Sequence, residues 1–124
     1  MTAFQAIQRA LRPFGWPAVP YVYGGKEKRY FTYNYADNHG DDFGNDIPGS
    51  VVVGVQVHMY LPITDPSTGN KTNFIQDQKT ARDALFHAGF TYPAVTIRRE
   101  DETECWHITF ECEFEEDPDV EAQD

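Results

Sequence analysis

The chain has 124 residues, of which 40% are hydrophobic and 15% aromatic, so it is long enough for one globular domain and too apolar for a disordered chain. Charged and glutamine residues in the first dozen positions do not suit a signal peptide, and no apolar run approaches the roughly 18 residues of a membrane span. We therefore expect a cytoplasmic protein with no membrane partner. The net charge of −10 argues against a protein that grips DNA, because phosphate neutralisation needs Lys and Arg.

The two cysteines lie seven residues apart, Cys105 and Cys112, within one predicted strand. An odd separation places them on opposite faces of a strand, about 23 Å apart at ~3.3 Å per residue. A disulfide needs Cα atoms within about 7 Å, so we expect two free thiols and a reducing compartment.

The N-terminal third predicts one helix and two strands. Residues 2–12 have the apolar spacing of a helix, with Thr2 as its cap and with Pro13 and Gly15 at its end. A short strand is predicted over 19–23. A second strand, over 28–35, alternates between its two faces, with Phe31 on one face and Tyr30 on the other.

The rest of the chain predicts three strands and a second helix. Residues 51–61 alternate throughout, with valines on one face, and residues 74–88 form a helix in which Asn73 and Gln76 resemble a capping box. Strands are predicted over 94–99 and 104–114. The order α-β-β-β-α-β-β predicts an α+β two-layer sandwich, with a mainly antiparallel sheet and two helices on one face. Residues 1–114 would form this single domain, and residues 115–124 a flexible acidic tail.

An acidic segment connects the second and third predicted strands. It contains Asp37, Asp41, Asp42, Phe43 and Asp46. The segment fails the EF-hand template in both registers, since position 12 from Asp37 is a proline and position 3 from Asp41 is Phe43. A non-standard cation site, a solvated loop and a partner-binding loop remain open. Phe43 would suit either a tip inserted into a neighbour or an ordinary loop anchor.

Polar residues also gather on the predicted outer face of the sheet. His58, Cys105 and His107 share this face, but no pair of them has the spacing of a usual zinc motif. Gln56, His58 and Tyr60 follow one another along the 51–61 strand, which indicates either an interface or an ordinary sheet surface. The sequence has no GxSxG, GxxxxGK[ST] or HExxH motif, so we expect no catalytic residue, cofactor or metal.

The segments "NYADN", "VVVGVQVHMYLP", "ARDALFHAGF" and "ECWHITFECEFEE", in this order of elements, resemble the small tail-completion proteins of long-tailed bacteriophages and prophages. This group is similar to the lambda-type tail terminator and head–tail joining proteins. The resemblance covers nearly the whole chain and includes no catalytic signature.

The resemblance implies a virion protein without a cofactor, assembled in the host cytoplasm. Such proteins form a ring, typically of six copies, that caps the tail tube and joins it to the head connector, so DNA would pass through without sequence-specific binding. Our own expectation places the assembly interface at the acidic segment and at Gln56, His58 and Tyr60. A ligand-binding protein, an enzyme of unknown substrate and a monomeric adaptor remain alternatives.

Overall fold

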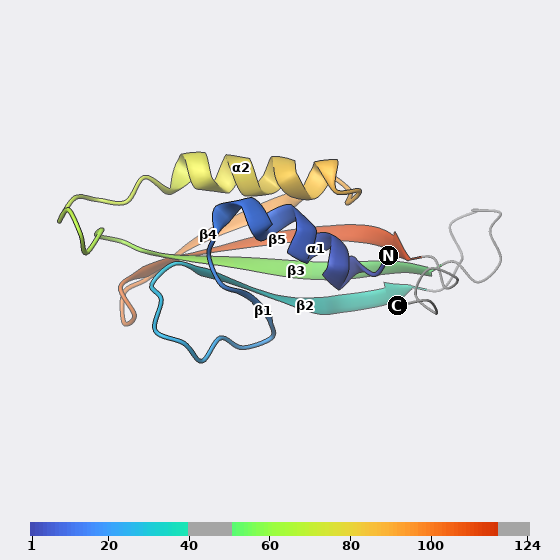
Figure 1. Ribbon diagram of the computed structural model, residues 1–124, viewed down its shortest axis with the longest axis horizontal. Helices are drawn as coiled ribbons and strands as arrows, with labels where there is room; N and C mark the ends of the chain where they lie inside the picture. Colours follow the sequence, from blue (N-terminus) through green and yellow to red (C-terminus); the bar gives the residue numbers. More distant parts are fainter. Residues whose placement is uncertain (40–50, 117–124) are drawn as a thin grey trace.

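The computed structural model describes residues 1–39 and 51–116. Two helices lie together on one face of a five-stranded sheet (Figure 1), so the predicted α+β two-layer class is confirmed. The sheet order is β1-β2-β3-β5-β4, with one parallel pair, β1 with β2, and antiparallel pairing elsewhere. The elements are α1 (Ala3–Leu11), η1 (Arg12–Phe14), β1 (Ala18–Pro20), β2 (Tyr30–His39), β3 (Val51–Pro62), α2 (Phe74–His87), β4 (Ala94–Glu100) and β5 (Cys105–Glu116).

Helix α1 begins and ends at the residues that the sequence indicates. The Thr2 side chain accepts a hydrogen bond from the backbone N–H of Gln5, and the Gln5 side chain accepts one from Thr2, which completes a capping box. Its buried face includes Ile7 and Leu11. The chain leaves the helix through η1 and turns at Gly15, whose φ of 72° favours glycine.

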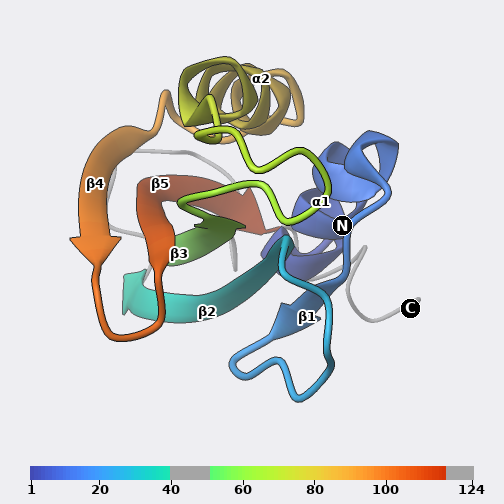
Figure 2. The ribbon, with the colours of Figure 1, turned by 90° about the vertical axis from the view of Figure 1, so that its left-hand side faces the viewer.

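Helix α2 lies beside α1 on the same face of the sheet, as the view along the strands shows (Figure 2). Asn73 caps it by accepting a hydrogen bond from the Ile75 N–H. The predicted capping box is not completed: the Gln76 amide nitrogen donates to the Thr80 hydroxyl, and its oxygen accepts no bond from the Asn73 N–H.

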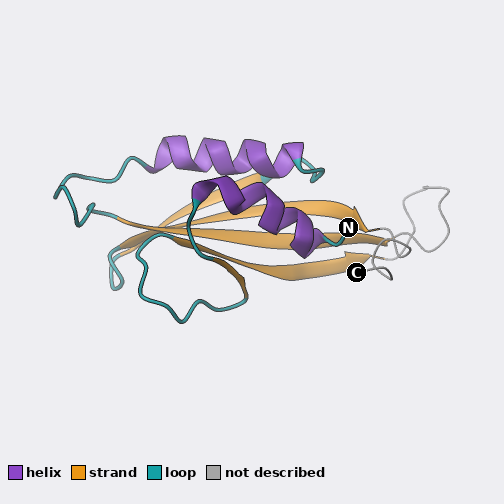
Figure 3. Cartoon of the chain, in the orientation of Figure 1, coloured by secondary structure: helices purple, strands orange, loops and turns teal. Residues whose placement is uncertain are grey.

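Strands β3 and β5 form the centre of the sheet and pair over twelve residues each, from Val51 with Glu116 to Pro62 with Cys105. Their alternation follows the sequence prediction: the inward side chains belong to the core and the intervening ones point to the opposite face. Both helices lie over one face of the sheet (Figure 3). The fully buried inward residues of these two strands are Val53, Val55, Val57, Met59, Leu61, Ile108 and Phe110.

The C-terminal ends of three strands differ from the prediction by two residues or more. The first strand is only Ala18–Pro20, because Tyr21 adopts a left-handed φ of 64° while its N–H bonds the Tyr33 carbonyl. Strand β2 continues to His39, so Asp37 lies in the sheet opposite Gly54 and not in the acidic loop. Antiparallel pairing with β3 holds this extension, after a register irregularity that follows Tyr35.

The third difference is at the end of β5, which continues to Glu116, two residues beyond the predicted domain. Residues 117–124 of the predicted tail lie outside the described residues. Within residues 1–39 and 51–116, no helix is long and apolar enough to cross a membrane.

Candidate functional site

The candidate site is the outer face of the sheet, on the side away from α1 and α2. Alternation along β2, β3 and β5 places polar and aromatic side chains there, because the intervening residues are in the core. The central members are Asn34, Gln56, His58, Tyr60, His107 and Thr109. These side chains are half-buried by one another, although no helix of the described chain covers this face.

A row of stacked rings crosses this face. Tyr30, Tyr60 and His107 occupy directly opposed positions on β2, β3 and β5, so strand register brings their rings together. The centroids are 4.6 Å apart for Tyr30 and Tyr60 and 4.4 Å apart for Tyr60 and His107, with interplanar angles of 18° and 22°. Tyr23, in the segment between β1 and β2, extends the row with its centroid 4.5 Å from that of Tyr30. We call these four residues the ring row.

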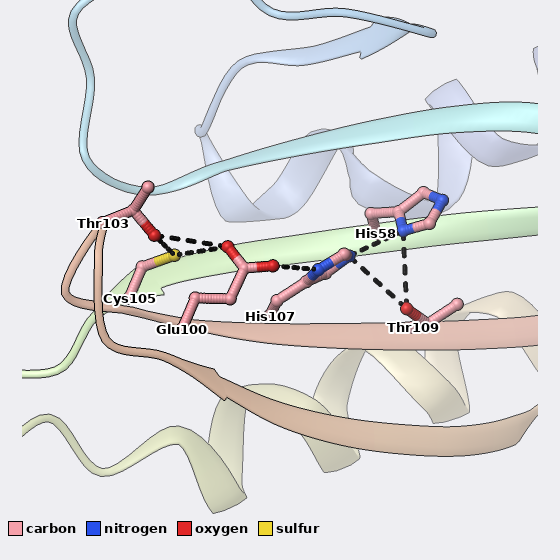
Figure 4. Close-up of polar contacts among 6 residues, drawn as sticks. All are labelled: His58, Glu100, Thr103, Cys105, His107 and Thr109. Carbon is pink, nitrogen blue, oxygen red and sulfur yellow. Dashed lines mark hydrogen bonds and ion pairs between the residues drawn. The ribbon is translucent and has the colours of Figure 1, made fainter.

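A hydrogen-bonded chain starts at the end of the ring row (Figure 4). His58 Nδ1 lies 2.8 Å from His107 Nε2, and His107 Nδ1 lies 2.9 Å from Glu100 Oε2. On the other side, His58 Nε2 is 3.1 Å from Asn34 Oδ1. The Thr109 hydroxyl lies beside both imidazoles, 3.4 Å from His58 Nδ1 and 3.5 Å from His107 Nε2.

Glu100 connects this chain to Cys105. The Cys105 thiol is 3.5 Å from Glu100 Oε1 and 3.1 Å from the Thr103 hydroxyl, which is itself bonded to Glu100. The thiol has no such contact with His107, and burial raises its pKa above the ordinary 9.0. This arrangement does not form a Cys–His dyad. The thiolate is the reactive form, and burial and Glu100 together outweigh the hydrogen bond from Thr103 that favours it.

Burial and neighbouring charges set the protonation of the other groups. Burial lowers the pKa of His58 below 6.5, and the charge of His107 lowers it further, while Glu111 opposes this change. The hydrogen bond from His107 is the largest cause of the lowered pKa of Glu100. Burial raises the pKa of Tyr30 and of Tyr60, so both hydroxyls keep their protons at neutral pH.

A groove of about 860 Å³ adjoins the ring row at the end of the sheet where the β4–β5 turn lies. Tyr23, Tyr30 and Tyr60 line it together with Cys105. Its remaining walls carry charges of both signs, from Lys26, Glu27, Lys28, Lys71, Arg99, Asp101 and Glu104. Among the described residues, no group of three or more His, Cys, Asp or Glu side chains is arranged to hold a metal ion.

The structure brings together only part of the predicted interface. Gln56, His58 and Tyr60 share the outer face: Tyr60 belongs to the ring row, His58 lies close to it, and Gln56 lies beside Asn34. The backbone of Asp37 is placed on β2. Four predicted residues lie outside the described ranges: Asp41, Asp42, Phe43 and Asp46.

Sequence reasoning missed Glu100, which it assigned to a turn. The four-residue connection between β4 and β5 pairs Glu100 with Cys105, and Arg98 with His107. Because Glu100 is paired with Cys105, whose side chain is outward, the Glu100 side chain also lies on the outer face. That register was the signal that could have identified Glu100.

Comparison with known proteins does not assign the chain to a family. No family model matches the chain, and no curated protein matches it. One solved chain with a similar path belongs to a structure described as "Virion of native gene transfer agent (GTA) particle". The two chains are 14% identical over 92% of each, with a TM-score of 0.49, so this likeness concerns the course of the chain alone.

Proposed function

We propose that the chain is a structural virion protein of a phage or prophage, which forms a ring that completes the tail and joins it to the head connector. The resemblance of its sequence segments to tail-completion proteins suggests the role. The observation that carries the proposal is the outer face of the sheet, where the ring row lies without a covering helix in the described part of the chain.

The ring row has the chemistry of a protein-binding surface. Tyrosine offers a large apolar area and a hydroxyl that can bond across an interface, and it is enriched at the centres of interfaces. Tyr30 and Tyr60 are held by stacking and by strand register, so little side-chain entropy remains to be lost on binding. In our proposal a second copy of this chain covers the row.

The edges of the sheet offer a second point of contact between copies. Strand β4 ends the sheet on one side. Ile97, on its inner face, and Arg98, on its outer face, are both exposed. On the other side β1 pairs with only three residues of β2. An exposed strand edge carries unpaired N–H and C=O groups that favour strand addition. A ring would bury such edges between neighbours.

The charge of the chain suits the proposed place in the virion neck. With a net charge of −10 per copy, a ring would repel DNA that passes through its lumen and would not bind it by sequence. The tail-tube and head-connector proteins would be its other partners. In this role the protein catalyses nothing.

Light scattering over a concentration series, with electron microscopy of any large species, tests the proposal. We expect a mass near six copies and ring-shaped particles. Tyr60→Ala should weaken self-association about thirtyfold, since a central interface tyrosine contributes about 2 kcal/mol. Tyr92→Ala is the matched control, because Tyr92 is exposed in the segment between α2 and β4. A chain that stays monomeric at every concentration, without rings, contradicts the proposal.

A further inference from the structure

The contacts of His58 and His107 determine how many protons the two rings carry. At its outer end each imidazole meets an oxygen atom: His107 Nδ1 faces Glu100 Oε2 at 2.9 Å and His58 Nε2 faces Asn34 Oδ1 at 3.1 Å. A carboxylate oxygen and an amide oxygen both accept hydrogen bonds and cannot donate them. Both outer ring nitrogens must therefore be N–H groups.

The orientation of the Asn34 amide is fixed by its other contacts. Its Nδ2 donates to the Tyr35 carbonyl at 3.3 Å and to Gln56 Oε1 at 3.4 Å. The Gln56 amide is oriented in turn by Glu111, whose Oε2 lies 3.5 Å from Gln56 Nε2. Rotating the Asn34 amide would turn its oxygen toward two other oxygens, so the acceptor beside His58 is well defined.

The contact between the two rings needs one more hydrogen. His58 Nδ1 and His107 Nε2 are 2.8 Å apart, which is a hydrogen-bond distance and requires one donor and one acceptor. The four ring nitrogens therefore carry three hydrogens, one more than two neutral imidazoles have. We propose that His58 and His107 hold a single shared positive charge, and that loss of this proton reorganises the polar chain from Glu100 to Glu111.

The surroundings favour one proton and oppose a second. Of the groups on neighbouring strands, Glu100 and Arg98 come from β4, Cys105 and Glu111 from β5, Tyr60 from β3 and Tyr30 from β2. Glu100 is the carboxylate in direct contact and balances the shared charge. Burial together with the charge of His107 lowers the pKa of His58, which makes His58 the neutral ring.

The same distance argues for a proton and against a metal ion between the rings. Two ligands at 2.0–2.1 Å from a tetrahedral zinc ion lie about 3.3 Å apart. The nitrogens here are 2.8 Å apart. A metal would have to push the strands or the rings apart, whereas a proton fits the contact as it is.

When the shared proton is lost, two N–H groups remain for three contacts. One contact is then left with two acceptor atoms and no hydrogen between them. If His107 keeps its hydrogen toward Glu100, the remaining inner hydrogen must come from His58 Nδ1, and His58 Nε2 then presents a lone pair to Asn34. If His58 keeps its hydrogen toward Asn34, a lone pair of His107 faces the Glu100 carboxylate. Rotation of the Asn34 amide relieves the first conflict but breaks the contact with Gln56. The outer face thus changes both its charge and its donor pattern with pH.

Long-range ¹⁵N–¹H NMR of the imidazoles, recorded from pH 5.5 to 9, tests this proposal directly. At about pH 6, near the ordinary histidine pKa, we expect His107 as the cation and His58 as the neutral Nε2–H form. His87, exposed on α2, is the reference in the same sample. Glu100→Gln should move loss of the shared proton to lower pH by about one unit, because the balancing charge is gone. Glu102→Gln, in the same turn, should not move it.

Asn34→Ala provides a second variant that does not depend on Glu100. Without the amide oxygen, the neutral pair meets no conflict at His58, so the shared proton should again be lost at lower pH. Two neutral or two cationic rings at about pH 6 would overturn the proposal. So would an unchanged titration in both variants, or stoichiometric uptake of zinc that abolishes the titration.

Discussion

The carboxylate of Glu116 accepts a hydrogen bond of 2.7 Å from the backbone N–H of Ala3, which joins the end of β5 to the first turn of α1. The same oxygen accepts a 2.9 Å bond from the Tyr35 hydroxyl. Helix α1 has no acidic residue in its own first turn, so Glu116 supplies the negative charge that a helix N-terminus favours. Glu116 is 5% exposed and belongs to the folded domain, despite lying in an acidic run.

Glu116→Gln should lower the free energy of unfolding by about 1–2 kcal/mol. The amide oxygen can still accept a hydrogen bond, but the charge that strengthens both contacts is lost. Urea denaturation measures this loss. Glu115→Gln, at an exposed position of the same strand, should change stability by no more than about 0.5 kcal/mol. Equal stability of the two variants would show that Glu116 does not anchor α1.

Two C-terminal truncations test which part of the acidic run contributes to the stability of the fold. A chain that ends after Asp117 keeps Glu116 and should melt within a degree or two of the full chain. A chain that ends after Phe114 lacks both contacts of Glu116 and should melt several degrees lower, at about 4 °C per kcal/mol. If the proposed ring forms, removing residues 118–124 should also strengthen self-association at low salt, because like charges then repel less. Equal melting of both shortened chains would contradict the anchoring role.

Alternation and capping made much of the fold predictable. The valines of β3 and the aromatic residues of β5 indicated their buried faces, and Thr2 and Asn73 indicated where the helices begin. Hydrophobic patterns carry this information because it is local. They also placed His58 and Tyr60 on the outer face correctly.

Local sequence patterns could not predict contacts between residues that are distant in the chain. The carboxylate of Glu116 is buried because the N-terminus of α1, more than a hundred residues earlier in the chain, lies against it. Thr32, an outward residue by alternation, is 5% exposed because it lies among the side chains of the outer face. The parallel pairing of β1 with β2 depends on the path around Gly15, which spacing alone does not define. These features follow from tertiary contacts, which override local preference.

Stability should depend on pH through His58 in a defined window. Its folded pKa lies below 6.5, so below about pH 6.5 His58 binds a proton in the unfolded chain more readily than in the folded chain. The free energy of unfolding should therefore fall as the pH drops from 6.5 toward the folded pKa. His58→Gln should remove this part of the slope, whereas His87→Gln should retain it. Identical slopes in the wild-type and His58→Gln proteins would contradict this prediction.

Glu100 contributes in a lower window. Its folded pKa is below 4.5, so its stabilisation is complete above that value and is lost as the pH falls through the folded pKa. Glu100→Gln should therefore differ from the wild type mainly above pH 4.5, and the two unfolding curves should approach each other in stronger acid. Curves that diverge on acidification would show that the sign of this contribution is wrong.

The two thiols should differ in reactivity with an alkylating reagent. Burial, with a smaller effect from Glu113, raises the pKa of Cys112 to about 12, and its side chain is almost fully enclosed. Cys105 is only half-buried. At pH 8 the folded protein should be labelled slowly at one site, and in urea at two. Cys105→Ser should abolish labelling of the folded state. Equal labelling rates at both thiols would mean that β5 opens readily.

Glu104→Gly should stabilise the protein by about 0.5–1 kcal/mol. Glu104 ends the β4–β5 turn with φ at 53°, a left-handed conformation that costs a residue with a Cβ atom about 1–2 kcal/mol. Glycine removes that cost and adds back about 0.5–1 kcal/mol of chain entropy. The backbone contacts of this residue, from Ile63 N–H to its carbonyl and from its own N–H to Asp101, do not involve the side chain.

Glu102→Gly is the matched control: Glu102 is in the same turn but has no positive φ, so glycine there should destabilise by a similar amount. Urea denaturation of both variants gives the comparison, and a loss of stability in Glu104→Gly equal to that in Glu102→Gly would show that the turn is not strained at Glu104.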